Sequence, residues 1–223
     1  MPSIKTTPTL QCKVCFKHFI PSNLHELFFK HICICQKCLE EYSPKIRPLK
    51  IDKVRGLYLY TYNDKIREKI YTFKGCGDIE LSSTFLSYYK AWLKTKFKGY
   101  KIAPVPSDEN SDKIRGFNHV QEIFKMLDLP IINCLYKKRN YKQADLTKEV
   151  RMKVSENLGI KNLESLKGKK ILLVDDVCTT GSTLKACIQL IKKAHPRKIN
   201  FLVIAKVMNN DSKNNPDKSK YAI

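Results

Sequence analysis

The sequence contains no apolar run of the roughly 18 residues that a membrane-spanning helix needs. The first residues, MPSIKTTPTLQCKVC, also lack the long apolar stretch of an export signal. Both absences predict a protein of the reducing cytoplasm, without a transmembrane segment. In that compartment we expect the nine cysteines to act as metal ligands or free thiols rather than as disulfide partners.

Acidic residues are scarce. The chain has 21 Asp and Glu against 42 Lys and Arg, which gives a formal net charge of +21. Residues 81–107 contain no acid but carry five lysines: Lys90, Lys94, Lys96, Lys98 and Lys101. A second basic run begins at Lys137 and continues to Lys153. Such an excess favours salt-sensitive binding to nucleic acid. A proteome rich in Lys and Asn would produce the same surface without such a partner, so composition leaves both interpretations open.

Two Cys-x-x-Cys pairs lie near the N-terminus, Cys12 with Cys15 and Cys35 with Cys38. Thiolates at this spacing can occupy two corners of a tetrahedron, and two such pairs complete a zinc site. The segment is too short to bury a core of its own. Metal binding would therefore supply much of its folding energy, which is roughly 10–16 kcal/mol in zinc-finger peptides.

We therefore predict a small zinc-ribbon module over residues 1–43. Cys33 is expected to be a spare thiol, with replacement of Cys35 as the alternative. His18 and His31 are expected to lie outside the ligand set. The four remaining cysteines are expected to be small buried residues or inert thiols: Cys76, Cys134, Cys178 and Cys187.

The most informative segment of the chain is residues 171–183, ILLVDDVCTTGST. Its four aliphatic residues are typical of a strand buried on both faces in a parallel sheet. Asp175 and Asp176 follow where such a strand ends, which is the edge where open α/β sheets bind ligands. A loop of small hydroxylated residues comes next, and then an amphipathic helix with Leu184, Ile188 and Ile191 on one face.

This order of strand, small-residue loop and helix predicts an anion-binding cradle, in which Gly181 lets the backbone approach its ligand. Two acids beside an anion site suit a phosphorylated sugar, because Mg²⁺ combines one or two carboxylates with substrate oxygens. No Gly-Lys-Ser/Thr follows, so the loop is not a Walker loop. The pattern resembles the signature of type I phosphoribosyltransferases, which bind phosphoribosyl pyrophosphate. An ordinary buried strand with a polar turn is the alternative, and the adjacent acids argue against it.

Strands and helices are expected to alternate through the rest of the chain. Strands are predicted over residues 56–62, 100–105, 131–136 and 198–207, and helices over 63–73, from Ser82 or Ser83 to about 97, over 117–128 and over 145–158. This alternation predicts an α/β fold, a parallel sheet wound on both faces. We expect a phosphoribosyltransferase-like domain over residues 56–208, a linker over 44–55 and a polar tail over 209–223. The aromatics of residues 85–92 are expected to be core rather than a base-stacking platform.

A third motif begins where the strand over 100–105 ends, Pro104-Val105-Pro106-Ser107, and continues to RGFN at residues 115–118. It can therefore face the same crevice as Asp175. A phosphoribosyl pyrophosphate site needs a second anion pocket for the diphosphate, and a glycine-bearing loop with an arginine suits that need.

Together these motifs resemble the ComF family of competence-associated, phosphoribosyltransferase-like proteins. The resemblance rests on the N-terminal zinc ribbon, PVP followed by RGFN, and then Gln143, Leu146, Arg151 and LLVDDVCTTGSTL, and it runs from Cys12 to about Val207. It implies a cytoplasmic factor of natural transformation that acts on incoming single-stranded DNA beside a helicase. Val154 stands where the family usually has Asn, and Asp108 and Glu109 stand where a basic residue is common. The first departure puts the acceptor chemistry in doubt.

The resemblance to phosphoribosyltransferases also implies roles for single residues. The ribose hydroxyls and Mg²⁺ would lie at Asp175 and Asp176. The 5′-phosphate would lie on the loop formed by Val177, Cys178, Thr179, Thr180, Gly181, Ser182 and Thr183. The pyrophosphate would meet Arg115, with Lys74, Lys113 and Ser107 as further candidates. Lys74 and Lys113 as solvated surface lysines, and Arg115 in an ion pair with Asp112, are the alternatives.

Three functional hypotheses follow. The protein could transfer phosphoribose to an acceptor, which includes the case of a nucleobase phosphoribosyltransferase unrelated to DNA. It could bind nucleic acid as a competence factor and keep the site as a sensor of phosphoribosyl pyrophosphate. It could also be a non-catalytic zinc-ribbon adaptor that docks a helicase. The intact acids argue against the adaptor, and the cradle together with the positive charge favours the second hypothesis or a blend of the first two.

Overall fold

The computed structural model describes residues 9–20, 32–138 and 157–208. Its strands are β1 (Leu10–Gln11), β2 (His18–Phe19), β3 (Pro44–Ile51), β4 (Val54–Thr61), β5 (Tyr100–Pro104), β6 (Leu135–Lys137), β7 (Leu158–Ile160), β8 (Lys170–Cys178) and β9 (Lys198–Lys206). Its α-helices are α2 (Gln36–Glu41), α3 (Asp64–Gly75), α4 (Lys90–Lys96), α5 (Glu109–Arg115), α6 (His119–Lys125) and α7 (Ser182–Lys192), and 3₁₀ turns cover Ile79–Phe85, Ser87–Tyr89 and Leu163–Ser165.

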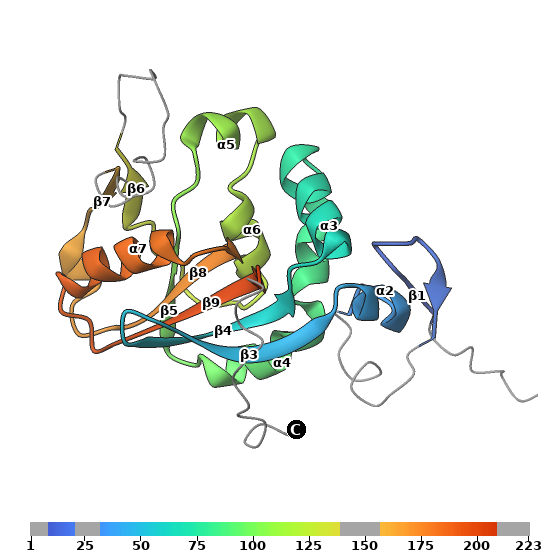
Figure 1. The fold of residues 1–223 in the computed structure, drawn as a ribbon, viewed down its shortest axis with the longest axis horizontal. Helices are drawn as coiled ribbons and strands as arrows, with labels where there is room; N and C mark the ends of the chain where they lie inside the picture. The colour runs from blue at the N-terminus through green and yellow to red at the C-terminus, as the bar shows by residue number, and fades with distance from the viewer. Residues whose placement is uncertain (1–8, 21–31, 139–156, 209–223) are drawn as a thin grey trace, which may run out of the picture.

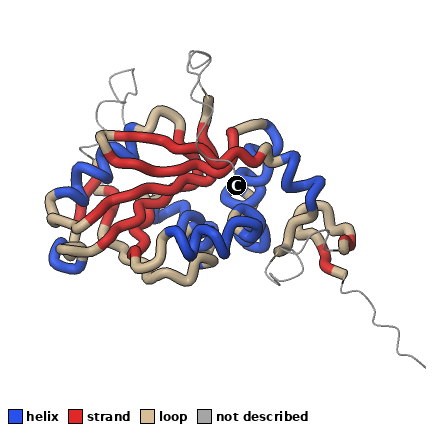
Figure 2. The backbone as a smooth tube through the Cα atoms, turned by 90° about the horizontal axis from the view of Figure 1, so that it is seen from below, coloured by secondary structure: helices blue, strands red, loops and turns tan. Residues whose placement is uncertain are grey.

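The main sheet has five strands in the order β3-β4-β9-β8-β5 (Figure 1). Strands β4, β9, β8 and β5 run parallel to one another, and β3 pairs with β4 in the antiparallel sense. Helices lie on both sides of the strands (Figure 2). The predicted class, an α/β fold with a parallel sheet wound on both faces, is therefore confirmed.

The central strands read as continuous apolar runs because both of their faces are covered. Leu172 and Val174 point into a core shared with α3, α4 and α6. Ile171 and Leu173, which alternate with them, point into a second core beneath α7. All four side chains are fully buried. This burial places the two acids that follow at the carboxyl end of a strand fixed from both sides.

The expected linker over residues 44–55 is wrong in its structure, because most of it belongs to the antiparallel hairpin of β3 and β4. Pro44 and Pro48 suggested a break in regular structure, but an edge strand tolerates proline on the side that pairs with nothing. Leu49 and Ile51 pack partly buried against the second core, which gives this strand a reason to stay on the sheet.

The helix expected from Ser82 or Ser83 is also wrong at its start. Residues 79–89 form 3₁₀ turns, and only α4 is α-helical. Asp78 caps the first turn by accepting a hydrogen bond from the Glu80 N–H. The hydroxyls of Ser83 and Thr84 donate back to main-chain carbonyls within the turn, which competes with α-helical pairing. Phe85 and Tyr89 are buried, as expected for core aromatics.

The structure adds one unexpected helix and shortens one expected strand, and it leaves two further expectations untested. Helix α5 was not predicted, although Asp108 gives it a side-chain cap at the Ser111 N–H. The strand expected over 131–136 is reduced to β6, which pairs with β7, and to a single bridge between Ile131 and Ile102. The helix expected over 145–158 and the tail over 209–223 fall mainly or wholly outside the described residues.

The N-terminal segment packs directly onto the main core at one end of the molecule (Figure 1). The Tyr42 ring stacks on Phe85 with centroids 6.0 Å apart and meets Tyr60 edge-on at 5.6 Å. Its hydroxyl lies 3.2 Å from the Thr84 hydroxyl. Among the described residues, no helix is both long and apolar enough to cross a membrane.

Candidate functional site

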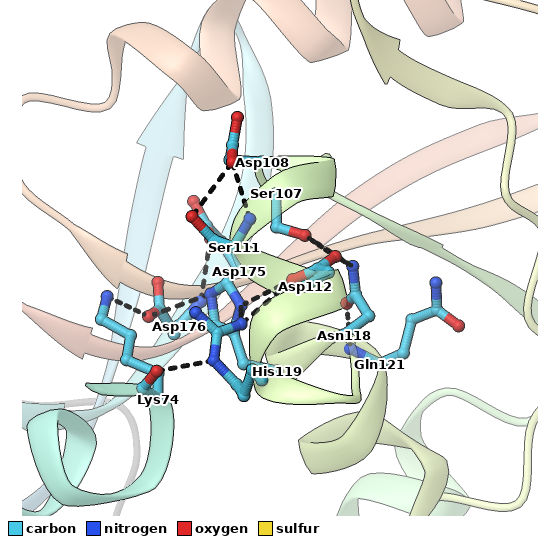
Figure 3. Close-up of polar contacts among 11 residues, drawn as sticks. Lys74, Ser107, Asp108, Ser111, Asp112, Asn118, His119, Gln121, Asp175 and Asp176 are labelled. Atoms are coloured by element: carbon cyan, nitrogen blue, oxygen red, sulfur yellow. Dashed lines mark hydrogen bonds and ion pairs between the residues drawn. The ribbon is translucent and has the colours of Figure 1, made fainter. Parts of the chain in front are cut away.

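Strand β8 ends in the two acids that the sequence singled out. Asp176 is almost fully buried, with 6% of its surface exposed. Lys74, from the last turn of α3, donates to its carboxylate at 2.8 Å, and His119 Nε2 lies 3.5 Å from the same oxygen (Figure 3). Two cationic or ionisable groups from different helices therefore surround one buried carboxylate.

The two neighbouring acids have opposite pKa shifts. Burial raises the pKa of the Asp175 carboxyl well above its ordinary value, and the charge of Asp176 raises it further. Burial also acts to raise the pKa of Asp176, but the hydrogen bond from His119 and the charge of Lys74 outweigh it and hold that pKa below its usual range. The opposite directions of the two shifts mean that Asp176 ionises before Asp175 as pH rises.

The loop after β8 turns sharply into α7. Gly181 has a φ of +81°, in the left-handed region that favours glycine. A Cβ there would lie 2.8 Å from the Ile51 side chain. Thr179, Thr180 and Ser182 are exposed around this turn. Because the first N–H groups of a helix have no partner inside it, the turn presents hydroxyls and amides to an anion.

Arg115, at the end of α5, is held on three sides. Its guanidinium pairs with Asp112 at 3.0 Å, lies 3.2 Å from His119 Nδ1 and donates through Nε to the Lys74 carbonyl at 2.6 Å. The alternative of an ion pair with Asp112 is therefore present in the structure. Gly116 ends α5 with a φ of +85°. The arginine thus connects α3, α5 and α6 below the site.

Asp112 collects the remaining polar groups of this motif. It accepts hydrogen bonds from the Ser107 hydroxyl and from the Asn118 amide, the second at 2.7 Å. Asn118 also donates to Ser107 at 2.7 Å. Its own carbonyl oxygen accepts from the Gln121 N–H and so caps α6. The cap explains why the residue after Asn118 begins a helix and points toward Asp176.

A cavity of about 740 Å³ lies over these groups. Five of the predicted site residues line it, from four separate parts of the chain: Lys74, Ser107, Arg115, Asp175 and Thr183. Lys113 is exposed and does not line it. Cys178 is buried in the core beneath α7, so its side chain does not face the site. The site residue missed from the sequence is His119, which lines the cavity and lies 3.5 Å from the Asp176 carboxylate. Asp112 was expected only as an alternative partner of Arg115, and that ion pair is present.

The four cysteines of the two Cys-x-x-Cys pairs converge in space. Their sulfur atoms all lie within 4.8 Å of one another: Cys12, Cys15, Cys35 and Cys38. Burial acts to raise the pKa of Cys12, but N–H groups of Cys35, Cys15 and Val14 pointing at its sulfur lower that pKa to about 7. Cys33 lies apart and meets the Ser83 hydroxyl at 3.2 Å. The cluster fits a zinc-ribbon module, with Cys33 outside it.

A family model matches the C-terminal part of the chain, and curated relatives match most of its length. The family model described as the phosphoribosyl transferase domain matches residues 115–223. Over 175 residues the chain is 29% identical to Competence protein ComFC of Bacillus subtilis (strain 168), which covers 78% of this chain and 68% of that protein. It is 26% identical to Competence protein ComFC of Streptococcus pneumoniae (strain ATCC BAA-255 / R6) over 72% of this chain and 74% of that protein.

The chain thus carries a phosphoribosyltransferase-type domain. It is a homologue of the ComFC competence proteins. Among solved structures, a hypoxanthine phosphoribosyltransferase from Staphylococcus aureus aligns with 82% of this chain and 77% of its own, at 12% identity and a TM-score of 0.35. A score this low carries no argument about the fold, which rests on the strand order itself.

Proposed function

We propose that the protein binds Mg²⁺ and phosphoribosyl pyrophosphate at the carboxyl end of β8 and acts on single-stranded DNA in natural transformation. The observation that carries the first part is one shared cavity. It is lined by Asp175 of the acid pair, by Thr183 after the glycine turn and by Arg115. Asp176 does not line the cavity itself but contacts two of its lining residues, Lys74 and His119. The second part is supported by the likeness to competence proteins and by the net charge of +21.

Each part of a phosphorylated sugar finds matching chemistry. The hydroxyls and amides of residues 179–183 suit the 5′-phosphate. Asp175 and Asp176 suit the ribose hydroxyls and would hold Mg²⁺, which would supply positive charge to neutralise the substrate oxygens. Arg115, and Lys74 once its ammonium leaves Asp176, suit the pyrophosphate. In the free protein the Lys74 ammonium neutralises the buried Asp176 carboxylate. When the ligand binds, this ammonium would move to the pyrophosphate and leave the carboxylate free for Mg²⁺.

Turnover would follow from the same placement. Loss of pyrophosphate from C1 leaves positive charge on the sugar ring, and an ionised Asp176 would lie on the side that stabilises it. His119 lines the cavity and also contacts Asp176 and Arg115. It would therefore position both groups. Pyrophosphate release with an acceptor present, lost in Asp175→Asn, would establish the enzyme.

Calorimetric titration with Mg²⁺ and phosphoribosyl pyrophosphate tests the site. We expect micromolar binding by the zinc-loaded protein and none by the double variant Asp175→Asn/Asp176→Asn. Asp128→Asn is the matched control, because it removes an acid whose partners Lys90 and Lys94 are remote from the cavity. Absence of binding in a folded wild-type protein, or equal binding by the double variant, would reject the proposal.

We also propose that the cysteine cluster holds one structural Zn²⁺, in a module separate in function from the phosphoribosyltransferase-type domain. Elemental analysis should find one zinc per chain, lost in Cys12→Ser and retained in Cys33→Ser. Loss of zinc should unfold the N-terminal segment, because its short strands have little core of their own. Full zinc content in Cys12→Ser would contradict the ligand set. We further propose that the protein works in the cytoplasm, where thiolates stay reduced.

A further inference from the structure

A second cavity, of about 630 Å³, lies where β4 and β9 begin and α7 ends. Its lining comes from the β3–β4 turn, the end of α7 and the loop into β9: Lys53, Val54, Arg55, Lys192, His195, Pro196, Arg197, Lys198, Ile199 and Asn200. In Figure 1 these segments meet at the left of the molecule. Five of the ten lining residues are Lys or Arg, and His195 adds a group that can become charged.

No acid lines this cavity. The nearest one that contacts its wall is Asp52, which accepts from Lys192 at 2.7 Å. The other cations, Lys53, Arg55, Arg197 and Lys198, are exposed. A concave surface lined by one sign of charge concentrates the potential and attracts the opposite charge. The cavity is therefore more electropositive than a surface that carries charges of both signs.

The arrangement of the strands adds repulsion between neighbours. Lys198 on β9 lies directly beside Lys170 on β8 in the parallel register. Like charges in such positions destabilise a sheet. Asn200, two residues after Lys198 on β9, is held by two hydrogen bonds: its side chain donates to the Arg55 carbonyl at 2.8 Å and accepts from the Tyr100 hydroxyl at 2.8 Å. A bound polyanion would reduce the repulsion between Lys198 and Lys170 without breaking the hydrogen bonds of Asn200.

This cavity is distinct from the candidate sugar-phosphate site. The two share no lining residue. Asp175 pairs with Val203, which lies five residues after Lys198 along β9. At about 3.3 Å per residue the two sites are roughly 16 Å apart along the strands.

We propose that this basic cavity is a second anion site, which holds the sugar-phosphate backbone of a single-stranded nucleic acid. The proposal extends the DNA part of the proposed function but does not depend on the sugar-phosphate site. A rigid duplex could touch only the rim of such a cavity, whereas a flexible single strand can bend into it. No aromatic side chain lines it, so contacts would be to phosphates and independent of base sequence.

A membrane surface fits the cavity less well than a nucleic acid strand. Amphipathic membrane contacts insert large apolar side chains beside their cations. None of the exposed large hydrophobic side chains in the described part of the chain lines the cavity. A planar lipid surface also cannot follow a concave wall.

The test measures binding of a fluorescein-labelled oligothymidylate of about 20 nucleotides by the full-length, zinc-loaded protein over a series of salt concentrations. The test variant is Arg55→Gln/Arg197→Gln/Lys198→Gln. The control, Lys94→Gln/Lys96→Gln/Lys98→Gln, removes the same charge from the acid-free segment. Each lost phosphate contact should reduce the slope of log affinity against log salt by roughly 0.7. We expect the test variant to lose about 2 from that slope and at least about tenfold in affinity at low salt, and the control to lose less than threefold.

Two further measurements keep the outcomes separate. Arg197→Lys/Lys198→Arg keeps the charge and should bind DNA like the wild type, which would show that the cavity recognises charge rather than the exact side chains. The test variant should still bind Mg²⁺ and phosphoribosyl pyrophosphate, and Asp175→Asn/Asp176→Asn should still bind the oligonucleotide. Equal losses in test and control variants, or no loss in either, would overturn the cavity while leaving the proposed function standing. Wild-type protein that binds anionic vesicles but no oligonucleotide would overturn the cavity and the DNA role together.

Discussion

The two ends of the same parallel strands handle charge in opposite ways. At the carboxyl end, Asp112 and Asp176 are buried or half-buried and each is paired with a cation, Asp176 with Lys74 from α3 and Asp112 with Arg115 of its own helix. At the amino end, Arg55, Arg197 and Lys198 are exposed around a cavity that no acid lines. A buried charge without a partner costs much free energy, whereas water weakens the repulsion between exposed like charges. The charges of a buried site therefore need partners within the protein, whereas exposed charges can remain unpaired until a ligand binds.

The first prediction breaks the buried pair. Lys74→Met leaves Asp176 with His119 as its remaining charge partner. Loss of one partner from a fully buried pair costs about 3–5 kcal/mol. The Lys74 side chain is 38% exposed, so we discount this for screening to about 1–3 kcal/mol. Thermal unfolding should show a Tm lower by about 3–10 °C.

The matched variant for Lys74→Met is Lys192→Met, which removes an ion pair of nearly equal length, 2.7 Å, with Asp52, whose side chain is 26% exposed against 9% for Asp176. Its Tm should not change measurably, because water replaces the lost partner. A Tm drop of equal size in both variants would remove burial as the cause of the difference between the two ends of the sheet.

The second prediction separates the two adjacent acids by the sign of their pH dependence. The folded pKa of Asp175 is raised, so the wild type loses stability through this residue as pH rises above the unfolded value of about 3.9. Asp175→Asn should therefore be more stable than the wild type at pH 8, by at least about 3 °C in Tm, which corresponds to about 1 kcal/mol. The gain should vanish near pH 4. The same variant should lose sugar-phosphate binding.

Asp176 should behave in the opposite way. Its folded pKa is lowered, so the stability it contributes is present above the unfolded value and is lost as pH falls through the folded one. Asp176→Asn should therefore be less stable than the wild type at pH 8, with a difference that shrinks in acid. Shifts of the same sign in both variants would show that the charge is not held on Asp176.

The third prediction concerns the glycine turn. Gly181→Ala places a Cβ on a backbone with a φ of +81°, which costs about 1–2 kcal/mol. Gly99→Ala has the same strain at a φ of +78°, far from the site and with no atom within 4 Å. Chemical denaturation should show a loss of stability for both, larger in Gly181→Ala because the Ile51 side chain must also move, whereas calorimetry should show weaker binding of phosphoribosyl pyrophosphate in Gly181→Ala alone. Equal binding by both variants would separate the turn from the ligand.

The smallest effect is expected at the amino end. Lys198→Thr removes the repulsion with Lys170 and should raise the free energy of unfolding by roughly 0.2–1 kcal/mol at low salt. The gain should disappear in 1 M salt, where the screening length falls to about 3 Å. Lys101→Thr is the control, because its neighbour across the sheet is Ile171. A gain that salt does not change would point to strand propensity instead of charge.

Local patterns predicted much of the fold. Residues 171–174 are apolar without alternation, and that pattern alone indicated a strand covered on both faces. The two Cys-x-x-Cys pairs predicted a metal cluster whose sulfur atoms do converge. Both predictions succeeded because the physical requirement is local: a doubly covered strand needs apolar side chains at every position, and a tetrahedral site needs closely spaced thiolates.

Other features depended on distant parts of the chain. Prolines and charges at 44–55 indicated a linker, and only pairing with β4 made residues 44–51 a strand. His119 carries no signal of its own, and it belongs to the site because the Asn118 cap points α6 toward β8. Lys74 looked like a surface lysine until α3 placed it 2.8 Å from an acid 102 residues away.

Sequence alone was enough to predict the doubly covered central strand with its acid pair, the cysteine cluster and the excess of positive charge. The tertiary structure alone decided which charges are paired and which are left for a ligand. The reason is the range of the forces involved. Periodicity and ligand spacing act between neighbours in the chain, whereas burial and ion pairing depend on which segments the fold brings within a few ångströms of one another.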